Sequence, residues 1–107
     1  MGQSSRHHMQ RLVEQPTDHG DLFEGSVRLG RVHYHLSVYQ HFADAGNESV
    51  PANLEVEGRI EPLDDVDLGP LHRRASELTI RLSDGRTLDV SLIDAEGRIR
   101  STGRGLY

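Results

Sequence analysis

The stretch ELTIRLSDGRTLDVSL at residues 77–92 decides the fold class, because it places two strands around a tight turn. Apolar and polar residues alternate on both sides of residues 83–85, which is the period of a half-buried strand. A two-residue turn would set Leu82 opposite a threonine and break the apolar face. A three-residue loop with Gly85 in the left-handed region pairs Leu82 with Arg86 and restores that face. We therefore predict a hairpin with a type I turn and a glycine bulge.

The same period of two recurs through the rest of the chain. It predicts four more strands, at residues 23–29, 32–38, 54–61 and 98–105. Gly30 and Arg31 are predicted to form the two-residue turn between the first two of these. Residues 94–97 are predicted to be a four-residue turn before the last strand. We expect residues 43–53 to form a loop and residues 70–75 a short helix that begins at a proline.

Six strands in antiparallel succession indicate an all-β domain. A single open sheet would leave its apolar face in water, so the sheet must close on itself or pack face to face. Glycines at positions 25, 58 and 103 fit tightly coiled strands. We expect a small six-stranded antiparallel barrel or barrel-like sandwich built from β-hairpins, with at most one short helix. Its most buried residues are expected to be Val27, Leu36, Val56, Ile80, Leu82, Val90 and Leu92.

The length and composition fit this small domain. A chain of 107 residues and 12.0 kDa holds one domain, which we place at residues 21–107, after a flexible tail at residues 1–20. Residues 1–8 contain serines and a His-His pair before Met9, a pattern found in expression tags, and Met9 would then be the natural start. All 12 basic residues are arginine, a bias typical of GC-rich bacterial genomes.

Several function classes fit the sequence poorly. The net charge of −5 argues against general nucleic-acid binding. No apolar segment approaches the roughly 18 residues of a membrane span, so we expect a cytoplasmic protein without a membrane partner. The chain has no cysteine, and it lacks the nucleophile-elbow, dinucleotide-binding, zinc-protease and Walker motifs. We therefore expect no cofactor.

His33 and His35 are the strongest candidates for chemistry. Residues two apart on a strand point the same way at a spacing of about 6.6 Å. Two such imidazoles can share a metal ion with a carboxylate from a neighbouring strand, and Glu57 is the candidate third ligand, with Glu55 and Glu61 on the same face. This site requires the two strands to pair directly, which the long loop between them leaves open. The alternative, which the sequence favours, is that both histidines lie on a solvated strand face and bind no metal.

Gln40 falls on the apolar side of its strand, and a buried amide needs hydrogen-bond partners. Either the strand bulges or ends there, or the barrel mouth is open and polar. In the second case Tyr34, Gln40 and Phe42 would line one end of a ligand cavity.

Two charged groups have simpler interpretations. The acidic residues Glu61, Asp64, Asp65 and Asp67 are expected to form a solvated loop, because they lack the spacing of a calcium loop. The arginines at positions 98, 100 and 104 are expected to protect an edge strand, and the alternative is an anion site.

Together these observations favour a bacterial binding domain without enzymatic activity, whose partner is a small molecule or another protein. The alternative is a small metal-dependent enzyme that uses His33 and His35. A homo-oligomer that hides part of the sheet is a third hypothesis.

Overall fold

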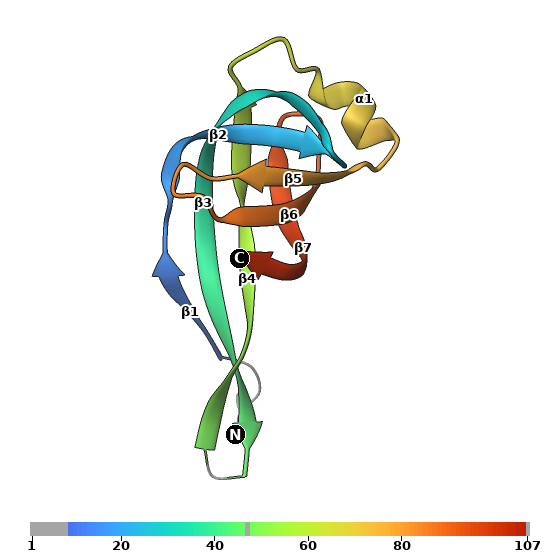
Figure 1. The fold of residues 1–107 in the computed structure, drawn as a ribbon. Coiled ribbons are helices and arrows are strands. Elements are labelled where there is room, and N and C mark those ends of the chain that lie inside the picture. Colours follow the sequence, from blue (N-terminus) through green and yellow to red (C-terminus); the bar gives the residue numbers. More distant parts are fainter. Residues whose placement is uncertain (1–8, 47, 107) are drawn as a thin grey trace.

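A computed structural model describes residues 9–46 and 48–106 and shows a closed barrel with a projecting arm (Figure 1). The elements are β1 (Met9–Glu14), β2 (Thr17–Glu24), β3 (Val27–Ala45), β4 (Glu48–Pro62), α1 (Leu68–Arg73), β5 (Glu77–Arg81), β6 (Thr87–Leu92) and β7 (Arg98–Leu106). In the described part of the chain, no helix is long and apolar enough to cross a membrane.

A ring of six antiparallel strands closes the barrel, as the sequence predicts. The ring runs β3–β2–β5–β6–β7–β4, and β4 pairs with β3 to close it. The seventh strand, β1, lies beside β2 on the same edge of β3. Because β3 is 19 residues long, it can pair with β2 along its first half and with β1 along its second half.

The hairpin over residues 77–92 and the turn after it are confirmed. The backbone nitrogen of Leu82 donates to the Arg86 carbonyl at 2.8 Å, and Gly85 has a φ of 96°. The four-residue turn at positions 94–97 is followed by the predicted pairing of Leu92 with Ile99. Helix α1 begins and ends two residues earlier than the helix predicted at residues 70–75.

The first predicted turn is wrong. The β2–β3 hairpin turns at residues 25–26, where Glu24 pairs with Val27, and β3 continues through Gly30 and Arg31. The register shifts by one residue inside this hairpin, and such a bulge moves the apolar phase to the other parity. The change of apolar phase at Gly30 and Arg31 therefore resembles a turn in the sequence, although a bulge causes it. Val27, expected in the core, lies beside the true turn and is 60% exposed.

Residues 9–20, expected in a flexible tail, instead form β1 and the beginning of β2. Residues 1–8 lie outside the described residues. The strands look polar in sequence because almost all side chains of β1 and of the start of β2 are exposed. The carbonyl of Pro16, between the two strands, accepts a hydrogen bond from the nitrogen of Leu36 at 2.9 Å.

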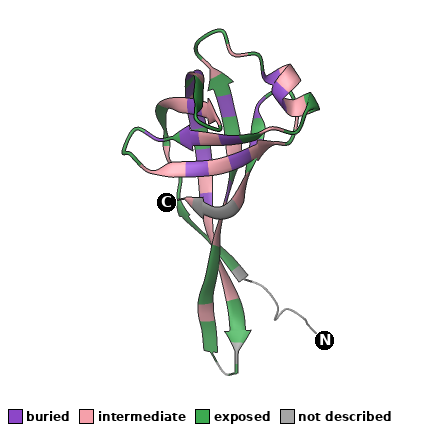
Figure 2. Cartoon of the chain, turned by 45° about the vertical axis from the view of Figure 1, so that its right-hand side comes forward, coloured by how far each residue is buried: buried purple, intermediate pink, exposed green. Residues whose placement is uncertain are grey.

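The predicted loop at residues 43–53 is also wrong, because β3 and β4 pair through this region to Ala45 and Glu48. This pairing forms the arm that extends beyond the barrel (Figure 1). Figure 2 shows exposed and partly buried residues along the arm and buried residues concentrated in the barrel. A strand whose two faces are both exposed to solvent has no alternation of apolar and polar residues, so the sequence pattern could not reveal this one.

The barrel interior contains most of the predicted core, with Leu92 only partly buried. Leu68 and Leu71 of α1 cover the barrel end opposite the arm (Figure 1). Tyr34 has the largest of the fully buried side chains. The predicted core residues confirmed as buried are Leu36, Val56, Ile80, Leu82 and Val90.

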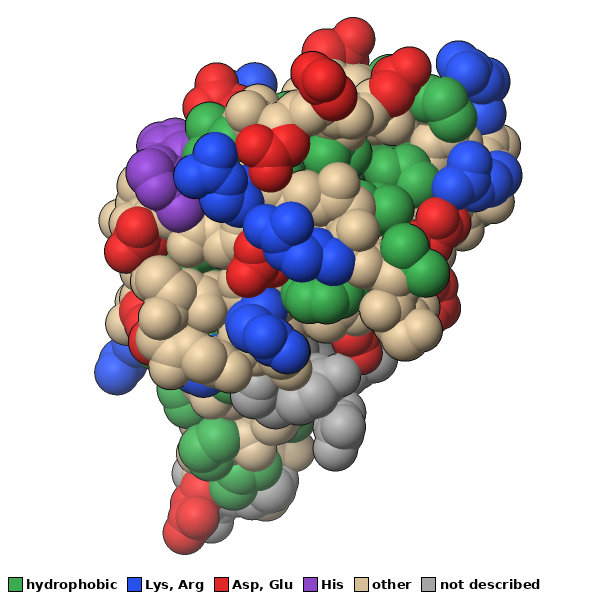
Figure 3. All heavy atoms as spheres, turned by 45° about the horizontal axis from the view of Figure 1, so that its top comes forward, with side chains coloured by type: hydrophobic (Ala, Val, Ile, Leu, Met, Phe, Trp, Pro, Cys, Tyr) green, Lys and Arg blue, Asp and Glu red, His purple; other side chains and the backbone are tan. Residues whose placement is uncertain are grey.

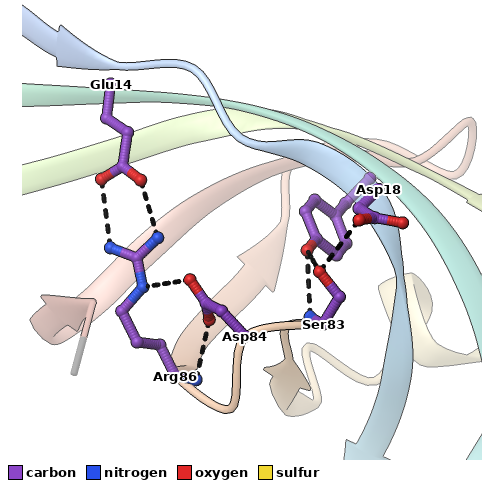
Figure 4. A network of polar contacts seen from close by, with 6 residues as sticks. Glu14, Asp18, Ser83, Asp84 and Arg86 are labelled. Atoms are coloured by element: carbon purple, nitrogen blue, oxygen red, sulfur yellow. Dashed lines mark hydrogen bonds and ion pairs between the residues drawn. The ribbon is translucent and has the colours of Figure 1, made fainter.

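A polar network fastens the N-terminal strands to the loop between β5 and β6 (Figure 4). The Arg86 guanidinium donates to the two carboxylate oxygens of Glu14 at 3.1 and 2.7 Å, and to Asp84 at 2.8 Å. The Ser83 hydroxyl donates to Asp18 at 3.0 Å. The hydrogen bonds from Arg86 lower the pKa of Glu14, so this carboxylate stays ionised at lower pH than an ordinary glutamate.

Candidate functional site

Three histidines and a glutamate gather on the outer wall of the barrel, where β2, β3 and β4 lie side by side. The register sets His33 of β3 opposite His19 of β2 and opposite Glu61 of β4. His35 is two residues further along β3, so its side chain points the same way. The direct pairing of β3 with β4 is the arrangement that a shared metal ion requires.

The side chains of this cluster are close together. His33 Nδ1 is 3.6 Å from a carboxylate oxygen of Glu61. The ring centroids of His33 and His35 are 4.5 Å apart, and those of His19 and His33 are 5.1 Å apart. One ligand atom from each of His33, His35 and Glu61 lies within 4.8 Å of the other two. The cluster is open to solvent, because the Glu61 side chain is 67% exposed.

The 3.6 Å between His33 and Glu61 is close to the ligand spacing of a metal site, whereas the 4.8 Å that bounds the whole set is longer. Zinc binds imidazole nitrogen and carboxylate oxygen at about 2.0–2.2 Å, so tetrahedral ligand atoms lie roughly 3.4 Å apart. The exposed Glu61 side chain can turn toward the two rings without moving the strands that hold them. The metal ion would then be bound by side chains of paired strands, whose backbone is already fixed by the hydrogen bonds among β2, β3 and β4.

A carboxylate also lies beside the histidines at Asp18. Its pKa is lowered, first by a hydrogen bond from the His19 backbone nitrogen and then by one from the Ser83 hydroxyl, with a smaller contribution from the charges of His19 and His33. Asp18 lies opposite the inward-facing Tyr34, on the other face of β2 from the His19 ring, and its side chain joins β2 to the loop between β5 and β6 through Ser83.

The structure places the third-ligand candidates differently from the sequence prediction. Glu57 lies opposite Ser37 and Arg100 instead of the histidines. Glu55 contacts His41 at 2.6 Å further along the arm. Only the register of β4 against β3 distinguishes these glutamates, and a sequence with an uncertain loop before β4 does not fix it.

His19 was missed, because it lies in the segment expected to be a tail. Recognising that β2 begins at Thr17 would have found it, because the pairing of β2 with β3 sets His19 opposite His33. An antiparallel strand before His33 brings a further side chain of the same type to the same face.

The three residues proposed to line a cavity are not brought together in the described part of the chain. Tyr34 is 1% exposed inside the barrel, and its hydroxyl accepts a hydrogen bond from the Ser83 nitrogen at 3.1 Å. Gln40 lies at the start of the arm, where its amide donates to a neighbouring backbone carbonyl at 2.9 Å. The β3–β4 register shifts between Gln40 and Phe42, where a step of two residues along β3 matches a step of three along β4, so the bulge is on the strand opposite Gln40 and not on its own strand.

The charged segments also have defined places. Asp64 accepts hydrogen bonds from the Arg31 nitrogen at 2.9 Å and its guanidinium at 3.3 Å, which lower the pKa of Asp64. Asp67 caps α1 through the Gly69 nitrogen at 3.1 Å. The arginines of β7 do not protect an edge, because β7 pairs with both β4 and β6. The side chain of Arg104 lies outside the described residues.

An open groove begins at His35 and crosses β4 to β7. Its volume is about 490 Å³. Arg59 of β4 lies directly opposite His35 on one side and Arg98 on the other. The residues that line the groove are His35, Ser37, Glu57, Gly58, Arg59, Ile93, Arg98 and Ile99.

Comparison of this chain with protein families, with curated proteins and with solved structures finds no match. The function is therefore argued from the surface itself. Figure 3 shows histidine side chains gathered in one patch, with arginine and acidic side chains beside them.

Proposed function

We propose that this protein is a binding domain whose barrel wall holds a divalent transition-metal ion such as Zn²⁺, without enzymatic activity. The observation that supports this proposal is the approach of ligand atoms from His33, His35 and Glu61 to within 4.8 Å of one another. Two imidazoles and a carboxylate are a donor set that suits zinc and its first-row neighbours.

The arrangement of the strands favours metal binding over a merely solvated face. His33 and His35 are fixed on one strand, and Glu61 reaches them from the next strand because the two are paired in register. Ligands on paired strands need little reordering when the ion binds, and this lowers the entropic cost of binding. His19 lies against His33 and is close enough to serve as a fourth ligand after a side-chain rotation.

One observation supports a second candidate, a small metal-dependent enzyme. Three protein ligands with an open fourth position are typical of catalytic zinc sites, and the groove beside His35 offers space for a substrate. Zinc-dependent hydrolysis of p-nitrophenyl acetate, lost in His33→Ala, would favour the enzyme. Zinc binding without turnover would favour the binding domain.

Calorimetric titration of zinc tests the proposal. The full chain is used with His7 and His8 replaced by alanine, because two adjacent N-terminal histidines would bind zinc themselves. We expect one zinc ion per chain and a loss of affinity of at least about tenfold, or 1.4 kcal/mol, in His33→Ala. His72→Ala is the matched control, since His72 lies in α1, and it should bind like the parent. Equal affinity of the two variants, or no saturable binding, would contradict the proposal.

A further inference from the structure

The groove beside the histidines contains two arginines that face each other. His35, Arg59 and Arg98 are directly opposite one another on β3, β4 and β7. Directly opposite residues have Cβ atoms about 4.5–5.5 Å apart and side chains on the same face of the sheet. The guanidinium groups of Arg59 and Arg98 therefore share one stretch of the groove.

Glu57 and Glu61 flank Arg59 on the same face of β4, but close ion pairs compensate these two cations only weakly. Like charges directly opposite each other on a sheet are destabilising. Among the described residues, Arg59 makes no ion pair, and the guanidinium of Arg98 pairs only with Asp94, at 3.9 Å. The Arg98 side chain is 63% exposed. By contrast, the guanidinium of Arg86 contacts Glu14 at 2.7 Å. An anion between Arg59 and Arg98 would relieve their repulsion.

The walls of the groove indicate what kind of anion fits. Glu57 lies two residues from Arg59 on the same face and also lines the groove, so it repels a second negative charge on a ligand. Ile93 is 38% exposed and offers an apolar surface beside the arginines. A volume of about 490 Å³ is within the range of small-molecule sites.

We propose that this groove binds a small organic monocarboxylate with an apolar body. The planar guanidinium groups of Arg59 and Arg98 donate to the carboxylate oxygens, a geometry for which arginine is well suited. The apolar body lies against Ile93, and Glu57 disfavours dianions such as phosphate. The site does not require the metal ion of the proposed function, so the two can be tested separately.

The experiment uses metal-free full-length protein at fixed ionic strength, with isovalerate as the probe and inorganic phosphate as the competitor. Nuclear magnetic resonance follows the arginine Nε–H signals and the Ile93 methyl groups. We expect saturable shifts at Arg59, Arg98 and Ile93 with isovalerate, and weaker binding of phosphate.

Two variants make the test specific. Arg59→Gln should weaken isovalerate binding at least tenfold. Arg73→Gln removes the same charge from α1, outside the groove lining, and it should bind like the parent. Unchanged methyl signals of Leu22, which is buried and outside the groove lining, would show that Arg59→Gln is folded. Shifts that do not saturate, equal losses in the two variants, or tighter binding of phosphate than of isovalerate would each overturn the proposal.

Discussion

Replacing Gly97 by alanine should destabilise the barrel much more than the same change at Gly85. Both glycines have φ in the left-handed region, 111° at Gly97 and 96° at Gly85. A Cβ added at Gly85 meets nothing within 4 Å, whereas one at Gly97 would lie 2.2 Å from the carbonyl oxygen of Ile60. The Ile60 nitrogen also donates to the Gly97 carbonyl at 2.8 Å. Gly97 therefore lies where β4 closes against the turn before β7.

The expected magnitudes follow from these contacts. The left-handed conformation costs a residue with a Cβ about 1–2 kcal/mol, and this is the whole expected loss for Gly85→Ala. Gly97→Ala adds a backbone clash, with a cost typical of overpacking of about 1–3 kcal/mol. It also adds the lost hydrogen bond to Ile60, worth about 1 kcal/mol. The expected loss is about 3–6 kcal/mol, a large part of the roughly 5–15 kcal/mol that stabilises a domain.

Urea denaturation followed by circular dichroism measures both losses. We expect Gly85→Ala to unfold at slightly lower urea than the parent, and Gly97→Ala to unfold at much lower urea or to be unfolded in buffer. A Gly97→Ala protein that is as stable as Gly85→Ala would refute the inference that β4 approaches this turn closely.

Two further predictions concern the core and the polar network. Leu82→Ala should reduce the free energy of unfolding by about 2–5 kcal/mol, because Leu82 is 3% exposed. Val27→Ala should change it by no more than about 0.5 kcal/mol, and similar urea midpoints for the two variants would contradict the core assignment. Hydrogen bonds from Arg86 lower the pKa of Glu14 below its ordinary value of 4.5. The ionised carboxylate therefore stabilises the fold above pH 4.5, and this stabilisation is lost as the pH falls through the lowered pKa. Glu14→Gln should therefore reduce the drop in melting temperature between about pH 5 and pH 3, and an unchanged drop would count against the Arg86 contact.

The barrel could be predicted where inward residues are apolar and a turn fixes the register. Residues 77–92 satisfy both conditions, since only one loop keeps Leu82 on the inner face. The β2–β3 hairpin did not, because a bulge near Leu29 changes the apolar phase without a turn. The arm was missed for another reason: its strands are solvated on both faces and carry no alternation.

The candidate site could likewise be predicted only in part. His33 and His35 could be found, because a spacing of two residues places both on one face of any strand. The choice of Glu61 over Glu57 depends on the register of β4 against β3, which the alternation of β4 does not fix, because both glutamates lie on the same face of that strand. His19 depends on recognising β2, whose beginning is polar because it is exposed.

The central claim is that His33, His35 and Glu61 bind one metal ion, and zinc titration followed by histidine ring resonances tests it most directly. The protein carries alanine at positions 7 and 8, with Glu61→Gln and Glu57→Gln as a matched pair that removes the same charge from the same strand. We predict saturable shifts of the His33 and His35 rings at micromolar zinc, weakened at least about tenfold in Glu61→Gln and unchanged in Glu57→Gln. Shifts that do not saturate, or equal weakening in both variants, would contradict the claim.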